Sequence, residues 1–303
     1  MKVTLDIDAL LADGEISQDE YQRISELSSR STASLGFNLL IAFGAVAVAI
    51  SMLVIVPTAG MAMAMGSIAL LGGLALRLGM AESFGLLGNI FLLIGSLLGG
   101  GGLIGEMEAN LASFLIVSAV LGAVSLVARS SLLMVMATLL LSAALGARTG
   151  YSHAAYFLII QEPLLTIALF SILGIAAYQV SFRVPTELET TVLASARTSV
   201  FLVNFGFWVG SLWGDRVLEV PVVSFTIGWT VALVATAAWA WHVNRRWVVN
   251  VVAVFAGIHL YTQWFEYFGA NAGTLLLGGV MALAFAFVLR AVNQVLVSKK
   301  ADV

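Results

Sequence analysis

The sequence contains no cysteine, which excludes disulfide bonds, thiolate zinc sites, iron–sulfur clusters and cysteine nucleophiles. Histidine is nearly as scarce, with 3 residues, so we expect no haem held by paired histidines and no other cofactor or metal. Charged residues make up only 10% of the chain, whereas soluble domains carry about 25%. So few charges cannot cover a surface that faces water, which argues against a soluble enzyme, a nucleic-acid-binding protein and a disordered protein.

Hydrophobic residues, by contrast, make up 60% of the 303 residues and form long runs. A membrane-spanning helix needs about 20 apolar residues, so the chain has room for about ten spans. We predict an all-α, polytopic transmembrane helix bundle over residues 35–295, preceded by a segment 1–34 and followed by a tail 296–303. The predicted spans are 37–56, 60–77, 84–104, 110–128, 131–147, 163–182, 195–213, 221–241, 247–265 and 273–292.

Residues 151–161 are apolar but too short to span a bilayer alone. Two interpretations remain open for them. The segment lies at the membrane interface before Pro163, or it extends the helix that follows.

The basic residues predict the orientation of these spans, because Lys and Arg concentrate on the cytoplasmic side of membrane proteins. With the N-terminus inside, every basic residue except Arg148 and Arg216 falls in an inner segment. No cleavable signal peptide is visible, since the first 30 residues are acidic and lack an apolar core. We therefore expect a multi-pass protein of a bacterial inner (plasma) membrane with both termini in the cytoplasm.

The first 34 residues read as a soluble helical hairpin. An apolar stripe runs from Leu5 to Leu11, Gly14 ends the first helix, and Ser17 and Glu20 form a capping box that starts a second. The string Leu11-x-x-Gly14-x-Ile16-Ser17-x-x-Glu20-Tyr21 resembles short hairpin modules of the SHOCT type. The hairpin either shields the first span or docks a cytoplasmic protein partner.

Two segments share a string of residues in register. Residues 89–100 and 204–215 both carry Asn, Gly, Ser, Leu and Gly at the same positions, from Asn89 and Asn204 onward. The segments are the third and seventh predicted spans, so they run in the same direction. This pattern favours two parallel four-helix repeats over about 60–147 and 163–265, although convergent packing motifs remain the alternative.

The C-terminal part carries a family resemblance. The stretch from His259 to Gly269, followed by Gly278-Gly279 and a helix that ends at Arg290, is similar to the C-terminal pattern of bacterial predicted membrane proteins gathered as domain-of-unknown-function family 2157. Members of that group also tend to begin with a short hairpin. The resemblance implies a prokaryotic inner-membrane protein and transfers no site residues.

Polar residues within apolar spans are costly in a membrane and mark candidate sites. In the seventh span their spacing places five of them on one helix face, and in the ninth span three more follow at i, i+4 and i+7. We expect both faces to point into the protein, where they either hold helices together or line a substrate path. The candidates are Arg197, Asn204, Trp208, Ser211 and Asp215 on the first face, and His259, Gln263 and Glu266 on the second.

A second group of polar residues, Arg148, His153 and Glu162, lies before the sixth span. Glu162-Pro163 is typical of a helix start, which by itself accounts for Glu162. Spaced glycines at Gly95 and Gly206 predict close helix packing, and the run Gly99–Gly102 is either a hinge or an unwound segment.

Sequence patterns of common enzymes, such as a phosphate-binding loop, HExxH or GxSxG, do not occur. We therefore predict no catalytic residues. Two function classes remain: a small secondary transporter or lipid-handling permease for an unknown small solute or lipid, and a non-catalytic membrane scaffold or accessory subunit. The possible repeat and the one-sided polar faces favour transport slightly.

Overall fold

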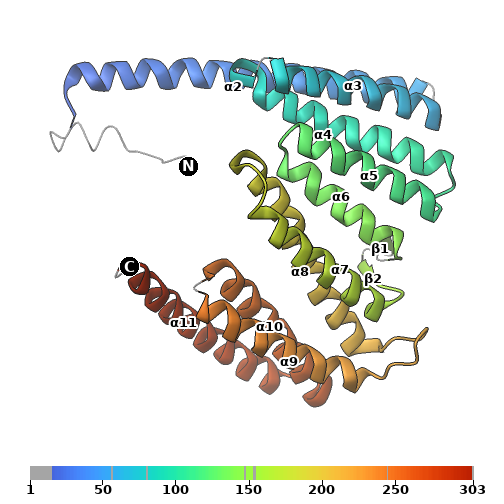
Figure 1. Cartoon of the computed structure of the whole chain (residues 1–303), viewed down its shortest axis with the longest axis vertical. Coiled ribbons are helices and arrows are strands. Elements are labelled where there is room, and N and C mark those ends of the chain that lie inside the picture. The colour runs from blue at the N-terminus through green and yellow to red at the C-terminus, as the bar shows by residue number, and fades with distance from the viewer. Residues whose placement is uncertain are drawn as a thin grey trace. The chain divides into compact units, whose positions relative to one another are not determined.

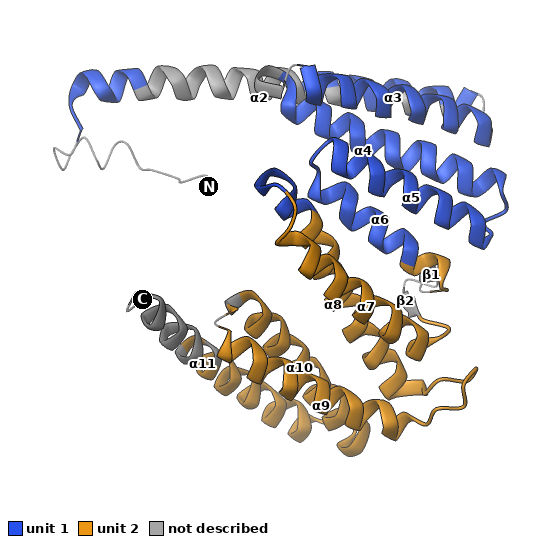
Figure 2. Ribbon diagram, viewed as in Figure 1, with its two compact units in different colours: residues 1–141, 185–191 blue, residues 142–184, 192–303 orange. Residues whose placement is uncertain are grey.

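A computed structural model describes residues 16–55, 57–79, 81–146, 148–152, 155–243 and 245–301. These residues form helices α2 to α11 and one small strand pair (Figure 1). The chain divides into two compact units, shown separately in Figure 2. Unit 1 comprises residues 1–141 and 185–191, and unit 2 comprises residues 142–184 and 192–303.

Each predicted apolar segment lies in a helix. The bounds are α2 Gln18–Ile55, α3 Ala59–Gly79, α4 Ala81–Glu106, α5 Leu111–Val127, α6 Ser131–Ala144, α7 Pro163–Ser181, α8 Thr186–Trp213, α9 Val222–His242, α10 Arg246–Phe268 and α11 Ala272–Ala301.

Six helices among the described residues are long and apolar enough to cross a membrane: α3, α4, α7, α8, α9 and α10. Apolar helical stretches of 10–17 residues lie in the other four predicted segments. Helix α6 has 14 residues, which extend only about 21 Å at 1.5 Å per residue, less than the thickness of the hydrocarbon core.

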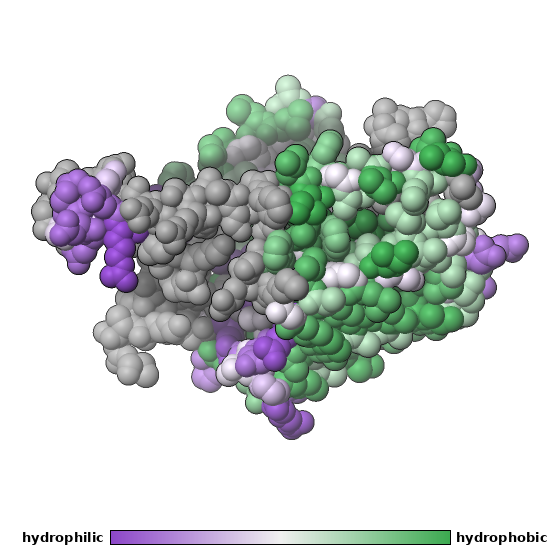
Figure 3. Space-filling model, turned by 90° about the horizontal axis from the view of Figure 1, so that it is seen from above, coloured by the Kyte–Doolittle hydropathy of each residue, from purple (hydrophilic) through white to green (hydrophobic). Residues whose placement is uncertain are grey.

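The outer surfaces of the helices are apolar, as expected for contact with lipid. Large side chains such as Ile68, Ile172 and Leu276 are more than two-thirds exposed. Figure 3 shows a broad hydrophobic surface with hydrophilic residues gathered at its ends. In water such a surface would favour aggregation, so the exposure pattern supports a membrane environment.

The capping box at the start of α2 is confirmed. The backbone N–H and hydroxyl of Ser17 both donate to the Glu20 carboxylate at 2.9 Å, and these bonds hold the pKa of Glu20 below its ordinary value. The predicted first helix of the hairpin, which ends at Gly14, lies outside the described residues. Helix α2 then continues without a break to Ile55, so its first turns and the first apolar segment are one helix.

In unit 1, α3 and α4 pack through glycines. A Cβ atom added at Gly66 would overlap the backbone of Gly99, and one added at Gly95 would overlap the backbone of Leu70. The glycines therefore allow an approach closer than any side chain permits, as predicted for Gly95. The run Gly99–Gly102 is helical throughout, so neither a hinge nor an unwound segment forms there; the backbone irregularity of α4 lies instead at Phe84.

Residues 151–161 are not a helix extension. Strands β1 (Arg148–Ser152) and β2 (Ala155–Ile159) pair antiparallel, and α7 begins only at Pro163. Proline at the first helical position provides the helix start, because it needs no hydrogen-bond acceptor there.

The two strings proposed as a repeat lie in different surroundings. Asn89 is exposed, whereas Asn204 is 8% exposed. Helix α4 continues past Gly99 to Glu106, whereas α8 ends at Trp213 and Gly214 has a positive φ of 68°. The parallel repeat stays a prediction.

Candidate ligand cavity of unit 2

Unit 2 encloses a cavity of about 370 Å³ between α7, α8, α9 and α10. Its walls are mainly aromatic and aliphatic, and the few polar groups come from side chains such as Asn204 and Thr236. Six aromatic rings line it: Phe170, Tyr178, Phe207, Trp229, Trp239 and Trp247. A volume above about 300 Å³ with apolar walls and few polar groups is typical of small-molecule sites.

Asn204 is the most buried polar residue that lines this cavity. Its amide Nδ2 donates to the Val200 carbonyl at 2.8 Å, and its Oδ1 accepts from the indole N–H of Trp229 at 3.0 Å. The prediction that this amide needs a partner inside the protein is confirmed. One N–H and one lone pair of Asn204 remain beyond these two bonds.

Two arginines lie beside the rings at one end of the cavity. The guanidinium of Arg197 stands 5.3 Å from the ring centre of Trp247, and that of Arg245 stands 5.8 Å from the ring centre of Tyr178. Both rings line the cavity. This is the end at which α7 and α9 finish and α10 begins.

The cavity also reaches the outer surface of unit 2. Ile175 lines the cavity and is 65% exposed, and the lining residue Trp239 is 44% exposed. One wall is therefore continuous with the apolar outer surface. A solute dissolved in the bilayer could enter through this wall without crossing water.

The second predicted face, on α10, does not line this cavity. The Nε2 of His259 lies 2.9 Å from the Thr230 hydroxyl, and its ring centre lies 4.6 Å from that of Trp229. The Thr230 hydroxyl also donates to the Thr226 carbonyl at 2.9 Å. The buried Nδ1 of His259 and the buried Nε2 of Gln263 have no hydrogen-bond partner among the described residues.

Of two further candidates, Trp208 joins two helices and Ser211 bonds within its own helix. The indole N–H of Trp208 donates to the Thr262 hydroxyl at 3.0 Å and so joins α8 to α10. The hydroxyl of Ser211, which is 2% exposed, donates to the Trp208 carbonyl. Neither residue lines the cavity, so of the first predicted face only Asn204 does.

Asp215 points into the protein, as its place on the predicted face suggested. It is 3% exposed, and its Oδ1 accepts from the backbone N–H groups of Val217 and Leu218. Its Oδ2 accepts from the backbone N–H of Leu164 at 3.1 Å and thereby caps α7. Glu162 occupies the N-cap position of α7 but makes no capping bond with its side chain, so a distant aspartate does what the neighbouring glutamate was expected to do.

The remaining candidates are dispersed. Arg197 and Glu266 are both exposed, so the expectation that these two point into the protein is wrong. Arg148 begins β1, and His153 lies outside the described residues. No cluster of metal-ligating side chains occurs among the described residues.

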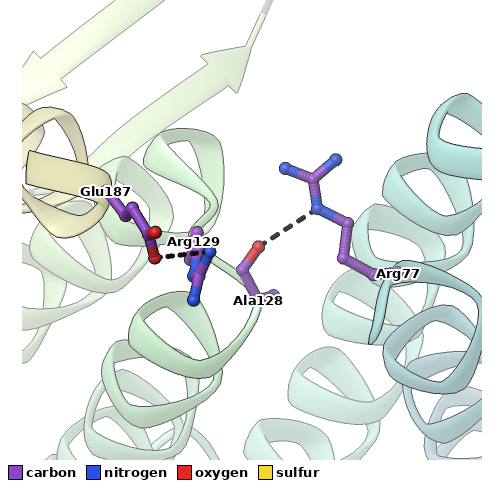
Figure 4. A network of polar contacts seen from close by, with 4 residues as sticks. All are labelled: Arg77, Ala128, Arg129 and Glu187. Atoms are coloured by element: carbon purple, nitrogen blue, oxygen red, sulfur yellow. Dashed lines mark hydrogen bonds and ion pairs between the residues drawn. The ribbon is translucent and has the colours of Figure 1, made fainter. Parts of the chain in front are cut away.

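Unit 1 contains a different polar group, drawn in Figure 4. The Arg77 side chain donates to the Ala128 carbonyl at 3.2 Å, and Arg129 pairs with Glu187 at 2.6 Å. These contacts join α3, the turn between α5 and α6, and the first turn of α8. Both side chains of the ion pair are more than half exposed, so its contribution to stability is small.

Of the residues that line the cavity, only Asn204 was predictable from the sequence as a site residue. Tyr178, Trp239 and Trp247 fall near helix ends, where aromatic residues commonly mark the membrane interface, so their pattern gave no indication of a shared site.

Comparisons of the chain with protein-family models, curated proteins and solved structures found no match.

Proposed function

We propose that the protein is a ten-span, multi-pass membrane protein of a bacterial inner membrane, and that unit 2 binds an apolar, ring-bearing small solute or lipid and moves it across the bilayer. The observation that carries this proposal is the aromatic cavity, which is open on one side to the apolar outer surface through Ile175. A helix bundle that served only as a scaffold would need no such space.

The proposed orientation places both termini in the cytoplasm. In unit 2, Arg183, Arg197 and Arg245 lie at the end where α7 finishes, whereas Asp215, Glu219 and Glu266 belong to the opposite end. The basic end then faces the cytoplasm. Reporter fusions after residues 80 and 245 should report the inside and those after 107 and 217 the outside; an odd number of spans would contradict this topology.

Transport is tested with two fluorescent amphiphiles that cross bilayers slowly. Full-length protein is reconstituted into liposomes, and the slow, transbilayer phase is recorded for the anion anilinonaphthalene sulfonate and the cation trimethylammonium diphenylhexatriene. We expect faster transbilayer movement of at least one of them. The proposal fails if the protein accelerates neither.

A matched pair of variants ties the result to the cavity. Ala232 lines the cavity, whereas Ala235, on the same helix, is exposed. Ala232→Phe should fill the space and abolish the acceleration, while Ala235→Phe should retain it. If the two variants had equal effects, the amphiphile would cross the protein by a route other than this cavity.

The scaffold remains the second candidate, because several predicted polar residues hold helices together. Trp208 binds Thr262, and Asp215 caps α7. In this alternative the N-terminal residues 1–34 dock a cytoplasmic protein. A folded protein that binds neither amphiphile would favour it.

A further inference from the structure

We propose that the cavity of unit 2 selects aromatic organic anions, with the ring system held among α7–α10 and the acidic group held by Arg197 and Arg245. This inference rests on the proposed function and adds the chemical class of the ligand. It predicts that the ligand is negatively charged, that it has the size of one ring system, and that its acidic group points toward the arginines.

The size of the cavity restricts the ligand to one ring system or one chain. At about 370 Å³ it lies near the lower end of small-molecule pockets, so a whole two-chained phospholipid does not fit. Rings prefer edge-to-face or offset contacts with other rings, and such contacts add to the gain from apolar burial. The rings that line the cavity, including Phe170, Trp229 and Trp239, therefore favour an aromatic body.

The sign of the charge follows from the two arginines. Among the described residues neither Arg197 nor Arg245 is paired with a carboxylate. Each guanidinium is held over a ring, which leaves its N–H groups at the edge for a carboxylate or sulfonate. Planar guanidinium groups bind such anions through two parallel hydrogen bonds.

The acidic residues nearby do not oppose an anion. Within unit 2, Asp215, Glu219 and Glu266 belong to the other end of the helices. Along α8 the acid nearest to Arg197 is Glu189, about two helical turns away. An anionic group beside Arg197 thus meets net positive charge.

The orientation follows from the membrane. Charge is costly in the hydrocarbon core, so an amphiphile keeps its acidic group at the interface and its rings in the apolar region. Arg245 directly precedes α10, and Arg197 lies beside Trp247 in the first turn of α10. Asn204 follows Arg197 by seven residues on α8, about 10 Å further along the helix axis. A ligand that enters past Ile175 would place its rings toward Asn204 and its acid at the arginines, and the remaining N–H of Asn204 could bind a neutral polar group on the rings.

The test uses two probes with the same rings. Anilinonaphthalene sulfonate is an anion, and phenylnaphthylamine is its neutral counterpart. Full-length protein in lipid nanodiscs is titrated with each probe, and binding is read as energy transfer from tryptophan, because Trp229, Trp239 and Trp247 line the cavity. We expect the wild type to bind the anion more tightly than the neutral probe, and high salt to weaken only the anion.

The double variant Arg197→Gln/Arg245→Gln should lower the affinity for the anion about tenfold or more, as for loss of charge-assisted hydrogen bonds. Its affinity for the neutral probe should stay within about twofold, since apolar burial is unchanged; this second titration also shows that the variant is folded. Replacement of both residues by lysine should restore part of the preference, because the charge returns without the paired geometry.

Arg216→Gln is the matched control. Arg216 is exposed and follows the opposite end of α8, roughly 24 Å from Arg197 along the helix axis. It should leave both affinities unchanged. The inference is overturned if the wild type does not prefer the anion, or if the double variant keeps that preference. Binding of the neutral probe would still support a ligand cavity in either case. If Ala232→Phe leaves the binding of both probes unchanged, the proposed function fails as well.

Discussion

In unit 1, α3 and α4 meet through glycines, whereas in unit 2, α8 and α9 meet through aromatic rings. Gly66 lies against the backbone of Gly99, while Phe207 and Trp229 stack with ring centres 6.5 Å apart. Backbones in direct contact leave little space between helices, and the cavity beside the glycines measures about 180 Å³. Rings keep backbones apart and leave about 370 Å³ in unit 2.

This difference shows how two equally apolar groups of helices can differ, one packed closely and the other with a cavity. In a membrane, lipid is as apolar as the side chains, so helices associate through close packing and a few hydrogen bonds. Unit 1 gains close packing from glycine and contains small gaps. Unit 2 relies more on side-chain hydrogen bonds between helices, such as the bond of Trp229 to Asn204, and it can therefore retain a ligand-sized space.

The largest effect is expected from one methyl group added at the glycine contact between α3 and α4. Gly66→Ala would place Cβ within the backbone of Gly99, where no side-chain movement relieves the overlap. We expect a loss of at least about 3 kcal/mol, at the upper end of overpacking effects, or loss of folded protein. Thermal unfolding in detergent measures this loss of stability.

Gly72→Ala is the control on the same helix. Its Cβ would lie 3.7 Å from the Phe91 ring, an ordinary contact, so stability should hardly change. If both variants behaved alike, the glycine contact would not be what holds α3 and α4 together.

The second test compares the helix caps of the two units. Asp215→Ala in unit 2 removes the acceptor for Leu164, Val217 and Leu218, and we expect a loss of about 2–3 kcal/mol. Asn110→Ala in unit 1 removes a single local bond to the Ser113 N–H and should cost about 1 kcal/mol. Chemical denaturation of each variant gives its free energy of unfolding. Glu162→Gln removes no capping bond, so it should leave that free energy unchanged.

The third test addresses the bond that joins α8 to α9 beside the cavity. Asn204→Leu leaves the buried indole N–H of Trp229 without an acceptor, at a cost of about 1–3 kcal/mol. Trp229→Phe removes that donor. The double variant should therefore lose less stability than the two single variants added together, as measured in a double-mutant cycle. Simple additivity would mean that the bond does not stabilise unit 2.

The helices, the buried position of Asn204 and the capping box at Ser17 were predictable because each depends on local spacing or on the cost of an unpaired polar group in lipid. The inward position of Asp215 was predictable in the same way, but its role as the cap of α7 was not, because its partner Leu164 is 51 residues away in the sequence and a single chain shows no sign of such a pair. The cavity was missed for the same reason. Whether rings fill a space or line it depends on the distance between backbones, which composition does not encode.

The smallest expected effect concerns a turn of unit 1. Arg129 follows α5 with a positive φ of 51°, a conformation that costs a side-chain-bearing residue about 1 kcal/mol, and its ion pair with Glu187 is exposed. Arg129→Gly removes both the strain and the ion pair, so the free energy of unfolding should change by less than about 0.5 kcal/mol. Arg129→Ala loses the ion pair and keeps the strain, so it should be the less stable of the two variants, and high salt should not change their order because neither retains the charge. If the glycine variant proved as unstable as the alanine variant, the left-handed backbone at this turn would carry no strain, and the ion pair with Glu187 would account for the whole effect.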